Sequence, residues 1–473
     1  MNDRRRIALS KAMAFMLAMI VSVGCSAEEA TSQTVLAGPL GELVQEDRIV
    51  RNVQEMVRIN TEFNKGHVAN HREVVDYIAN ELAQIEGVEY EVIVPSEPFE
   101  APYHRGLNVP FPGDPADFPV VVARIRGTQG TPVLGLSQLY NSVVIGDLNE
   151  WTVDPLGGEI IDGRIYGRGA TNSHASVANY LEVLRVISES DLRLAGDLVV
   201  AITPGEGGTE FGLPYAVDRR PDLMEADWYL MGCCGPNFTK HGGHIWAKIT
   251  VAGSMQHPIS GASANAVHQM ATIIPRIVDV HSWMTWEPEP LFGDREPYVE
   301  VTNVSSGYPR HVAVNVMPSE VEALLDLRLY SQQTPEQVVA ELQALLDQLM
   351  EEDPELYVEL EITGIQKPPA DVWDRITEDD PLVQEILELS REYTGDPSIE
   401  LQWRSGFAGG RPDLWNTGAK VLYSGGLSLP GGGGGGAHSA DEYISIDSLV
   451  PRTQLILAVV ERALVNGLTP DGR

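Results

Sequence analysis

The chain has 473 residues, of which 43% are hydrophobic and 21% charged, so it is too long for one small core and too apolar for a disordered chain. Its formal net charge of −34 at pH 7 would repel a phosphate backbone or an anionic lipid surface. We therefore expect a globular protein of two domains with no nucleic-acid partner. Small molecules, peptides and proteins remain as partners.

The first 25 residues have the layout of an export signal. Basic residues at 4–6 and Lys11 precede an apolar run over 12–23, which is too short to span a bilayer. The run ends in Val-Gly-Cys-Ser, which resembles the lipobox of bacterial lipoproteins with Cys25 as the lipidated residue. The sequence thus predicts a signal peptide over residues 1–25 and an exported protein of the bacterial cell envelope, a lipoprotein or periplasmic. It would meet the membrane only through a lipid anchor at Cys25; an ordinary signal cleaved nearby is the alternative.

Helical and strand-like patterns alternate along the first half of the chain. Helical spacing of apolar residues covers about 45–62, 70–86 and 173–190. Short apolar runs typical of buried strands lie near 90–95, 119–126, 132–137 and 198–202. This alternation predicts an α/β domain around a mostly parallel sheet.

From residue 243 the pattern changes. The expected elements are a strand to Val251, a helix at about 262–281, strands near 298–304 and 320–329, a helix at 334–350 and a strand at 356–363. The order strand, helix, strand, strand, helix, strand predicts an inserted ferredoxin-like α+β domain. Alternation resumes from about 381. We therefore expect the first domain in two parts, 26–242 and 365–473, interrupted by the insertion at 243–364.

Three motifs carry a family resemblance. They are Trp-Thr-Val-Asp-Pro-Leu-Gly-Gly from residue 151, Asp-Gly-Arg-Ile-Tyr-Gly-Arg-Gly-Ala over 162–170 and Ala-His-Ser-Ala-Asp-Glu-Tyr over 437–443. Together they resemble signatures of the aminoacylase, succinyl-diaminopimelate desuccinylase and glutamate carboxypeptidase superfamily of dizinc exopeptidases. The resemblance implies a zinc-peptidase-like α/β domain with a lid at 243–364. Such lids often dimerise in relatives, so a homodimer through the lid is an expectation here.

The sequence departs from this family at the expected metal ligands. The family's His-x-Asp strand end aligns with Leu-Tyr-Asn141, its bridging aspartate with Asn172, and its lysine with His174. The family's general base aligns with Glu206, and a glycine follows where the family has a ligand. A slip of one residue would make Glu206 a ligand instead.

Asp227 and His438 match the last two ligand positions, and relatives use these for different zinc ions. A catalytic zinc site has about three protein ligands. We therefore expect no cofactor, although zinc is the cofactor of the resembled family. The alternative is a relocated metal site assembled from His174, Glu206, Glu210, Asp227 and His438.

The remaining side chains predict acid–base chemistry on a small amide, N-acyl amino acid or peptide-like substrate. The predicted catalytic residues are Glu206 as general acid and base, His438, and His257, which the resemblance implies as an oxyanion-stabilising residue of the lid. The predicted substrate-binding residues are Asn141, Asn172, His174, Asn315, Arg328 and Arg411. Two alternatives stay open: a metal-free lyase, cyclase or isomerase on the same scaffold, and a non-catalytic pseudoenzyme that binds such ligands.

Overall fold

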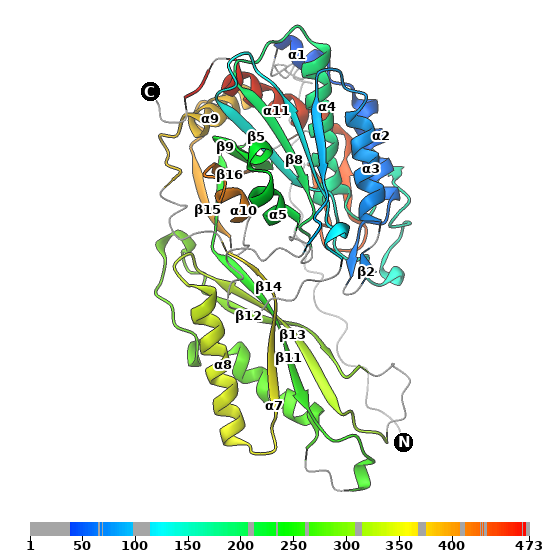
Figure 1. The fold of residues 1–473 in the computed structure, drawn as a ribbon, viewed down its shortest axis with the longest axis vertical. Coiled ribbons are helices and arrows are strands. Elements are labelled where there is room, and N and C mark those ends of the chain that lie inside the picture. The colour runs from blue at the N-terminus through cyan, green and yellow to red at the C-terminus, as the bar shows by residue number, and fades with distance from the viewer. Residues whose placement is uncertain are drawn as a thin grey trace, which may run out of the picture. The chain divides into compact units, whose positions relative to one another are not determined.

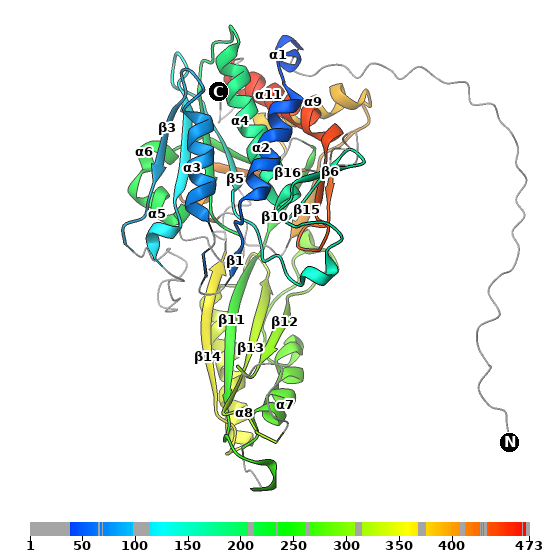
Figure 2. The same ribbon diagram turned by 90° about the vertical axis from the view of Figure 1, so that its right-hand side faces the viewer.

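Two β-sheets with their helices make up most of the structure (Figure 1; Figure 2 gives the view turned by 90°). The predicted signal peptide with Cys25 lies outside the residues that the structure describes. The computed structural model describes residues 38–64, 67–68, 70–97, 114–206, 212–232, 235–260, 264–307, 315–367, 375–406, 412–425, 427, 429, 433–465 and 467–469.

The larger sheet has eight strands in the order β15-β10-β16-β9-β5-β8-β4-β3. The four central strands, from β16 to β8, run parallel to one another, and the strands at both edges add antiparallel pairs. The strands are β3 (Glu89–Ile93), β4 (Val120–Ile125), β5 (Val133–Leu139), β8 (Asp197–Thr203), β9 (Trp228–Gly232), β10 (Asn237–His241), β15 (Gln402–Gly406) and β16 (Lys420–Gly425). The predicted α/β class with a mostly parallel sheet is confirmed.

Every residue of the central strand β8 is buried, because helices cover the larger sheet on both faces. The helices α2, α4 and α11 contact one another, and α4 and α11 also contact β5. A second group contacts other strands, with α5 against β4 and α6 against β8. These helices are α2 (Glu46–Arg58), α4 (Ala175–Glu189), α5 (Gly212–Arg219), α6 (Pro221–Met224) and α11 (Leu449–Leu464). Among the described residues, no helix is both long and apolar enough to cross a bilayer.

Helices also pack around the rim of the larger sheet. The helix α3 (His71–Leu82) contacts β3 and β4, α9 (Pro381–Thr394) contacts α11, and α10 (Pro412–Trp415) contacts α5 and β16. The short helix α1 (Gly38–Glu42) contacts α11. The N-terminal and C-terminal parts of the chain therefore pack into one layer structure.

A small four-stranded sheet joins two of the sequence motifs. Its order is β17-β18-β7-β6, with β6 (Glu159–Ile161), β7 (Arg164–Tyr166), β17 (Gly434–Gly435) and β18 (Tyr443–Ser445). This sheet was not predicted from the sequence, because strands of two or three residues show no alternating pattern. A Cβ on Gly434 would lie 1.8 Å from Oγ1 of Thr171, so part of the glycine run packs against the motif around residue 170.

The second large sheet is antiparallel, in the order β12-β13-β11-β14, and carries two helices. The elements follow the order strand, helix, strand, strand, helix, strand. They are β11 (Gly243–Ala252), α7 (Ala266–Val278), β12 (Tyr298–Ser305), β13 (Glu320–Leu329), α8 (Pro335–Glu352) and β14 (Val358–Gln366). Its role as a lid and the exact domain boundaries stay predictions.

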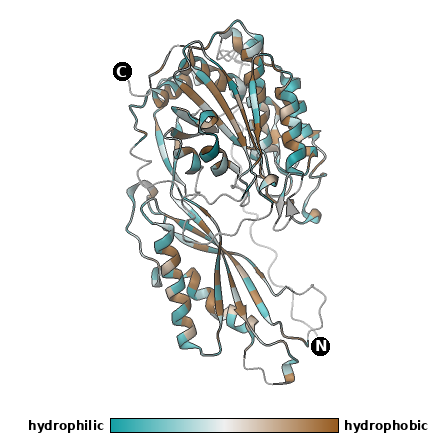
Figure 3. Ribbon diagram, in the orientation of Figure 1, coloured by the Kyte–Doolittle hydropathy of each residue, from teal (hydrophilic) through white to brown (hydrophobic). Residues whose placement is uncertain are grey.

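Each of the two large sheets has its own hydrophobic core. One cluster of buried side chains lies between the larger sheet and its helices, and a separate one lies between the second sheet and α7 and α8. In Figure 3 the hydrophobic colour follows the strands of the larger sheet and the helix faces against them. The two cores are expected to respond separately to mutation.

The helix ends differ from the predicted ones for local reasons. The helix α2 ends at Arg58 instead of about 62, because Ile59 already has an extended backbone. The helix α7 begins at Ala266 instead of about 262, because the Asn265 side chain accepts hydrogen bonds from the backbone N–H groups of the first turn.

Truncation of the second core gives a direct test of its separate packing. Leu346→Ala on α8 removes a fully buried side chain, so we expect a loss of about 2–5 kcal/mol in the free energy of unfolding. Urea unfolding followed by circular dichroism measures this loss. The exposed Asp347→Ala on the same helix serves as the control and should change the stability by less than about 0.5 kcal/mol.

Candidate active site

Glu206 lies just beyond the carboxyl end of the central strand β8, and Asn141 holds its backbone in place. The Asn141 side-chain oxygen accepts hydrogen bonds from the backbone N–H groups of Gly205 and Glu206, both at 3.0 Å. The Asn141 amide donates back to the carbonyl oxygen of Glu206 at 2.9 Å. These three bonds leave the Glu206 carboxylate 16% exposed at the edge of the sheet.

Three of the predicted site residues meet at this point. The side-chain amide nitrogen of Asn172 lies 3.3 Å from Oε2 of Glu206 and 3.0 Å from Nε2 of His438. The same Nε2 atom lies 3.1 Å from Oε1 of Glu206. A carboxylate, an amide and an imidazole therefore form a closed triangle, with the His438 ring half exposed.

The triangle favours a proton on His438. The hydrogen bond to the Glu206 carboxylate raises the pKa of His438 above its ordinary value, against the opposing effect of burial. The charge of Glu442 raises the pKa of His438 further, and that of Arg168 lowers it. Protonated His438 donates from Nε2 to Glu206, whereas neutral His438 accepts at Nε2 from Asn172. The arrangement can thus hold a proton next to a carboxylate.

The backbone leading to Asn172 is fastened by a buried carboxylate that the sequence analysis did not single out. Glu442 accepts a hydrogen bond from the Arg168 guanidinium at 2.7 Å, and both side chains are at least 97% buried. The same carboxylate accepts from the backbone N–H groups of Gly169, Thr171 and Asn172 at 2.9–3.1 Å. The sequence signal for this pair is that one motif, over 162–170, contains the positively charged Arg168 and another, over 437–443, contains the negatively charged Glu442.

Asp441, next to Glu442, binds the third motif, which begins at Trp151. The Asp441 carboxylate accepts hydrogen bonds from the backbone N–H and the hydroxyl of Thr152, at 2.8 and 2.9 Å. The Arg168 guanidinium also lies over the ring of Trp151, 5.0 Å from its centroid. All three motifs of the sequence analysis therefore converge on one site.

Two residues predicted to bind substrate are buried instead. Asn141 and His174 are both fully shielded from solvent. His174 contacts the carbonyl oxygen of Tyr140 through Nε2 at 3.0 Å, and burial lowers its pKa to about 4. This corrects the prediction: Asn141 positions the Glu206 turn, and His174 is a neutral histidine within the core.

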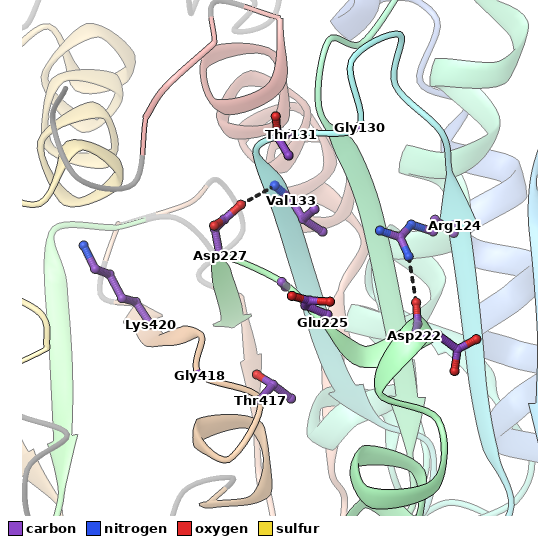
Figure 4. A pocket seen from close by; sticks show the side chains of 11 residues that line it. Arg124, Gly130, Thr131, Val133, Asp222, Glu225, Asp227, Thr417, Gly418 and Lys420 are labelled. Carbon is purple, nitrogen blue, oxygen red and sulfur yellow. Dashed lines mark hydrogen bonds between the residues drawn. The ribbon is translucent and has the colours of Figure 1, made fainter.

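Asp227 does not lie beside His438. It precedes the parallel strand β9 at its amino end, whereas Glu206 follows β8 at its carboxyl end. A strand of this length separates its ends by roughly 15 Å. The Asp227 carboxylate accepts a hydrogen bond from the backbone N–H of Val133 and lines a different pocket, of about 510 Å³ (Figure 4). The prediction that Asp227 occupies a remnant ligand position next to His438 is therefore wrong.

The residues predicted on the lid lie on the second sheet. The strand β11 begins after Gly242, whose N–H bonds to Gly406 of the larger sheet, and its ten residues span about 33 Å. The strand β11 pairs with β13 up to Ala252. His257 and Asn315 both lie beyond this end of the pair, where the N–H of Met317 bonds to the carbonyl oxygen of Gln256. His257 therefore lies beyond the end of β11 that is remote from Gly406, and its predicted catalytic role stays a prediction.

Arg328 lies nearer the start of β11, where Gly242 bonds to the larger sheet. It sits on β13 opposite His244 of β11, and its guanidinium donates to the Asp326 carboxylate at 2.6 Å. Its predicted contact with substrate stays a prediction. Arg411 and Glu210 lie outside the described residues.

Comparison with known proteins decides the family. The model of peptidase family M20/M25/M40 matches residues 142–462. The chain belongs to this family. It is an M20 hydrolase similar to dipeptidases and desuccinylases, and the predicted family resemblance is confirmed.

Individual relatives are distant in sequence. The cysteinylglycine-S-conjugate dipeptidase of Corynebacterium striatum is 27% identical over 50% of this chain and 62% of its own length. The succinyl-diaminopimelate desuccinylase of Thioalkalivibrio sulfidiphilus is 26% identical over 72% of this chain and 86% of its own.

Solved structures share the fold. Human carnosine dipeptidase 1 aligns with a TM-score of 0.69 at 14% identity, over 89% of this chain and 98% of its own. An M20 metallo-carboxypeptidase from Sulfolobus solfataricus aligns with a TM-score of 0.66 at 17% identity, over 88% of this chain and 99% of its own.

Family membership corrects the prediction about cofactors. Enzymes of the M20 family are dinuclear zinc metallopeptidases, so the expectation that this protein needs no cofactor is wrong at the level of the family. The described part of the site offers Glu206 and His438 as ligands, and the described residues include no group of three or more His, Cys, Asp or Glu side chains that could hold a metal ion. Two protein ligands are fewer than a catalytic zinc ion requires, so the described residues do not by themselves fit a dizinc centre.

The buried histidines of the M20 protein predict acid sensitivity. Burial lowers the pKa values of His71, His174 and His241 to about 4, while the unfolded chain takes up these protons near pH 6.5. Their contribution to stability is therefore complete above about pH 6.5 and lost as the pH falls towards 4. His174→Gln should reduce the pH slope of the unfolding free energy in this window by about one proton, or ~1.4 kcal/mol per pH unit.

Urea unfolding at a series of pH values measures this slope. The exposed His268→Gln is the matched control. An unchanged slope in His174→Gln would show that His174 is not neutral in the folded protein.

Proposed function

We propose that this M20 protein hydrolyses the amide bond of a small peptide-like or N-acyl amino acid substrate, with Glu206 as general base. The observation that supports this most is the triangle of Glu206, Asn172 and His438 at the carboxyl end of β8. Ligands of α/β proteins bind at this edge of the sheet. The names of the relatives, a dipeptidase and a desuccinylase, indicate the same bond type.

In the proposed reaction, one proton moves from water to the leaving group through Glu206. Glu206 takes a proton from a water molecule as the water oxygen bonds to the carbonyl carbon of the substrate. The carbon–nitrogen bond then breaks, and the proton passes to the leaving nitrogen. Asn172 donates to the carboxylate and orients it, and the imidazole of His438 lies beside it, 3.1 Å from Oε1.

Replacement of the base tests the proposal. Glu206→Gln keeps the shape of the side chain but cannot accept the proton, so kcat should fall by about 10²–10⁴ with little change in KM. A panel of dipeptides and N-acyl amino acids assayed for amine release measures this loss. The exposed Glu150→Gln, at the end of the short 3-10 helix Leu148–Glu150, is the control.

The outcome also separates an enzyme from a ligand-binding pseudoenzyme. A wild-type protein that binds these compounds by calorimetry yet releases no amine, with and without added zinc, would refute hydrolysis. In that case Glu206→Gln would have no turnover to lose.

We also propose that the protein is exported with a lipid anchor at Cys25 and forms a homodimer through its second sheet. The signal-like residues 1–25 support export. The dimer is supported by the position of His257, which lies at the far end of β11 and would serve the site of a second copy.

Mixing of two inactive variants tests the dimer. Glu206→Gln and His257→Ala should each lose activity, but a statistical mixture of the two subunits contains heterodimers with one intact site. Such a mixture should recover about a quarter of the wild-type rate after exchange of subunits. No recovery, together with a monomeric mass in light scattering, would refute the dimer.

A further inference from the structure

Glu442 lies outside the reactive triangle of Glu206, Asn172 and His438, but it binds the backbone that carries one of these residues. Its carboxylate is 1% exposed and accepts four hydrogen bonds, from the guanidinium of Arg168 and from three backbone N–H groups of the segment 169–172. The last of these donors is the backbone N–H of Asn172, at 2.9 Å. The side chain of that same residue bridges Glu206 and His438.

The backbone at Asn172 has no regular structure of its own to hold it. Its φ and ψ angles are −122° and 82°, and those of Ser173 are −141° and 23°, both outside the helical region, although the helix α4 begins at Ala175. Besides the bond from the N–H of His174 to the carbonyl oxygen of Gly169, this segment is held by the Glu442 carboxylate, which accepts from three of its backbone N–H groups. Without the carboxylate, the backbone N–H groups of Gly169, Thr171 and Asn172 would each lose this partner.

We propose that Glu442 is a positioning residue of the active site, which holds Asn172 where its side-chain amide can orient the Glu206 carboxylate and contact His438. This inference rests on the proposed function, because Glu206 is taken as the base. Glu442 itself touches none of the reacting atoms and acts through the backbone of Asn172.

The decisive variant is Glu442→Gln. Its amide group would point a donor at the Arg168 guanidinium or at a backbone N–H, so the segment 169–172 cannot keep all four bonds. We expect kcat to fall about 10- to 100-fold with KM within about twofold, as for other supporting residues of active sites. We also expect the NMR resonances of the Asn172 side-chain amide to shift in the unliganded variant, because this amide no longer lies between Glu206 and His438.

A matched control exists in the same domain. Glu182 is also 1% exposed and is paired with an arginine, Arg48, at 2.7 Å, and it accepts a further hydrogen bond from the backbone N–H of Gln45. Glu182→Gln should leave kcat and the Asn172 amide resonances unchanged. Equal losses in both variants would assign Glu442 a purely structural role and overturn the proposal.

A second variant covers the case in which Glu442→Gln does not fold. Glu442→Asp keeps the charge that pairs with Arg168 but withdraws the carboxylate by one methylene, so kcat should still fall and the Asn172 amide resonances should still shift. Retention of wild-type kcat and of the wild-type Asn172 amide resonances in either folded variant would overturn the proposal. If the wild type hydrolyses no amide, the proposed function fails, while the Asn172 amide resonances of the unliganded variants still decide whether Glu442 positions Asn172.

Discussion

The buried ion pair between Arg168 and Glu442 is the contact on which the active site depends. Burial of two charges is costly unless further hydrogen bonds compensate, and here three backbone N–H groups complete the shell of the carboxylate. The partners are 274 residues apart in the chain. The strands β7 and β18 pair directly beside them, with Tyr166 opposite Tyr443. The site therefore exists only after the C-terminal segment has joined the first half of the domain.

The site combines a rigid base with a fastened loop. Glu206 extends from a strand whose residues are all buried, and the Asn141 side chain fixes the following turn. Asn172, in contrast, belongs to an irregular segment whose backbone N–H groups donate hydrogen bonds to Glu442. In the reactive triangle, Glu206 is therefore positioned by the hydrophobic core and Asn172 by the polar network of Glu442. A mutation can alter either of these two supports separately.

Sequence motifs located part of this site and misplaced the rest. Glu206, Asn172 and His438 came from motif alignment, and the structure brings them together. Asp227 was misplaced because a motif gives an order along the chain, whereas the structure shows that it precedes its strand at the opposite edge of the sheet. His174 and Asn141 were misassigned because burial depends on packing by distant segments. The strands β17 and β18 were too short for any pattern to reveal.

The triangle has two hydrogen-bond states that differ by one proton. Nε2 of His438 carries either a proton or a lone pair, so its contacts with Glu206 and with Asn172 exclude each other as donor and acceptor bonds. In the protonated state the imidazolium donates to the carboxylate, and in the neutral state the amide of Asn172 takes over. The hydrogen bond from His438 to Glu206 has the largest effect on this balance and favours the protonated state, whereas the charges of Glu442 and Arg168 act in opposite directions. The buried pair therefore shapes the site, and the contact between His438 and Glu206 decides where its proton resides.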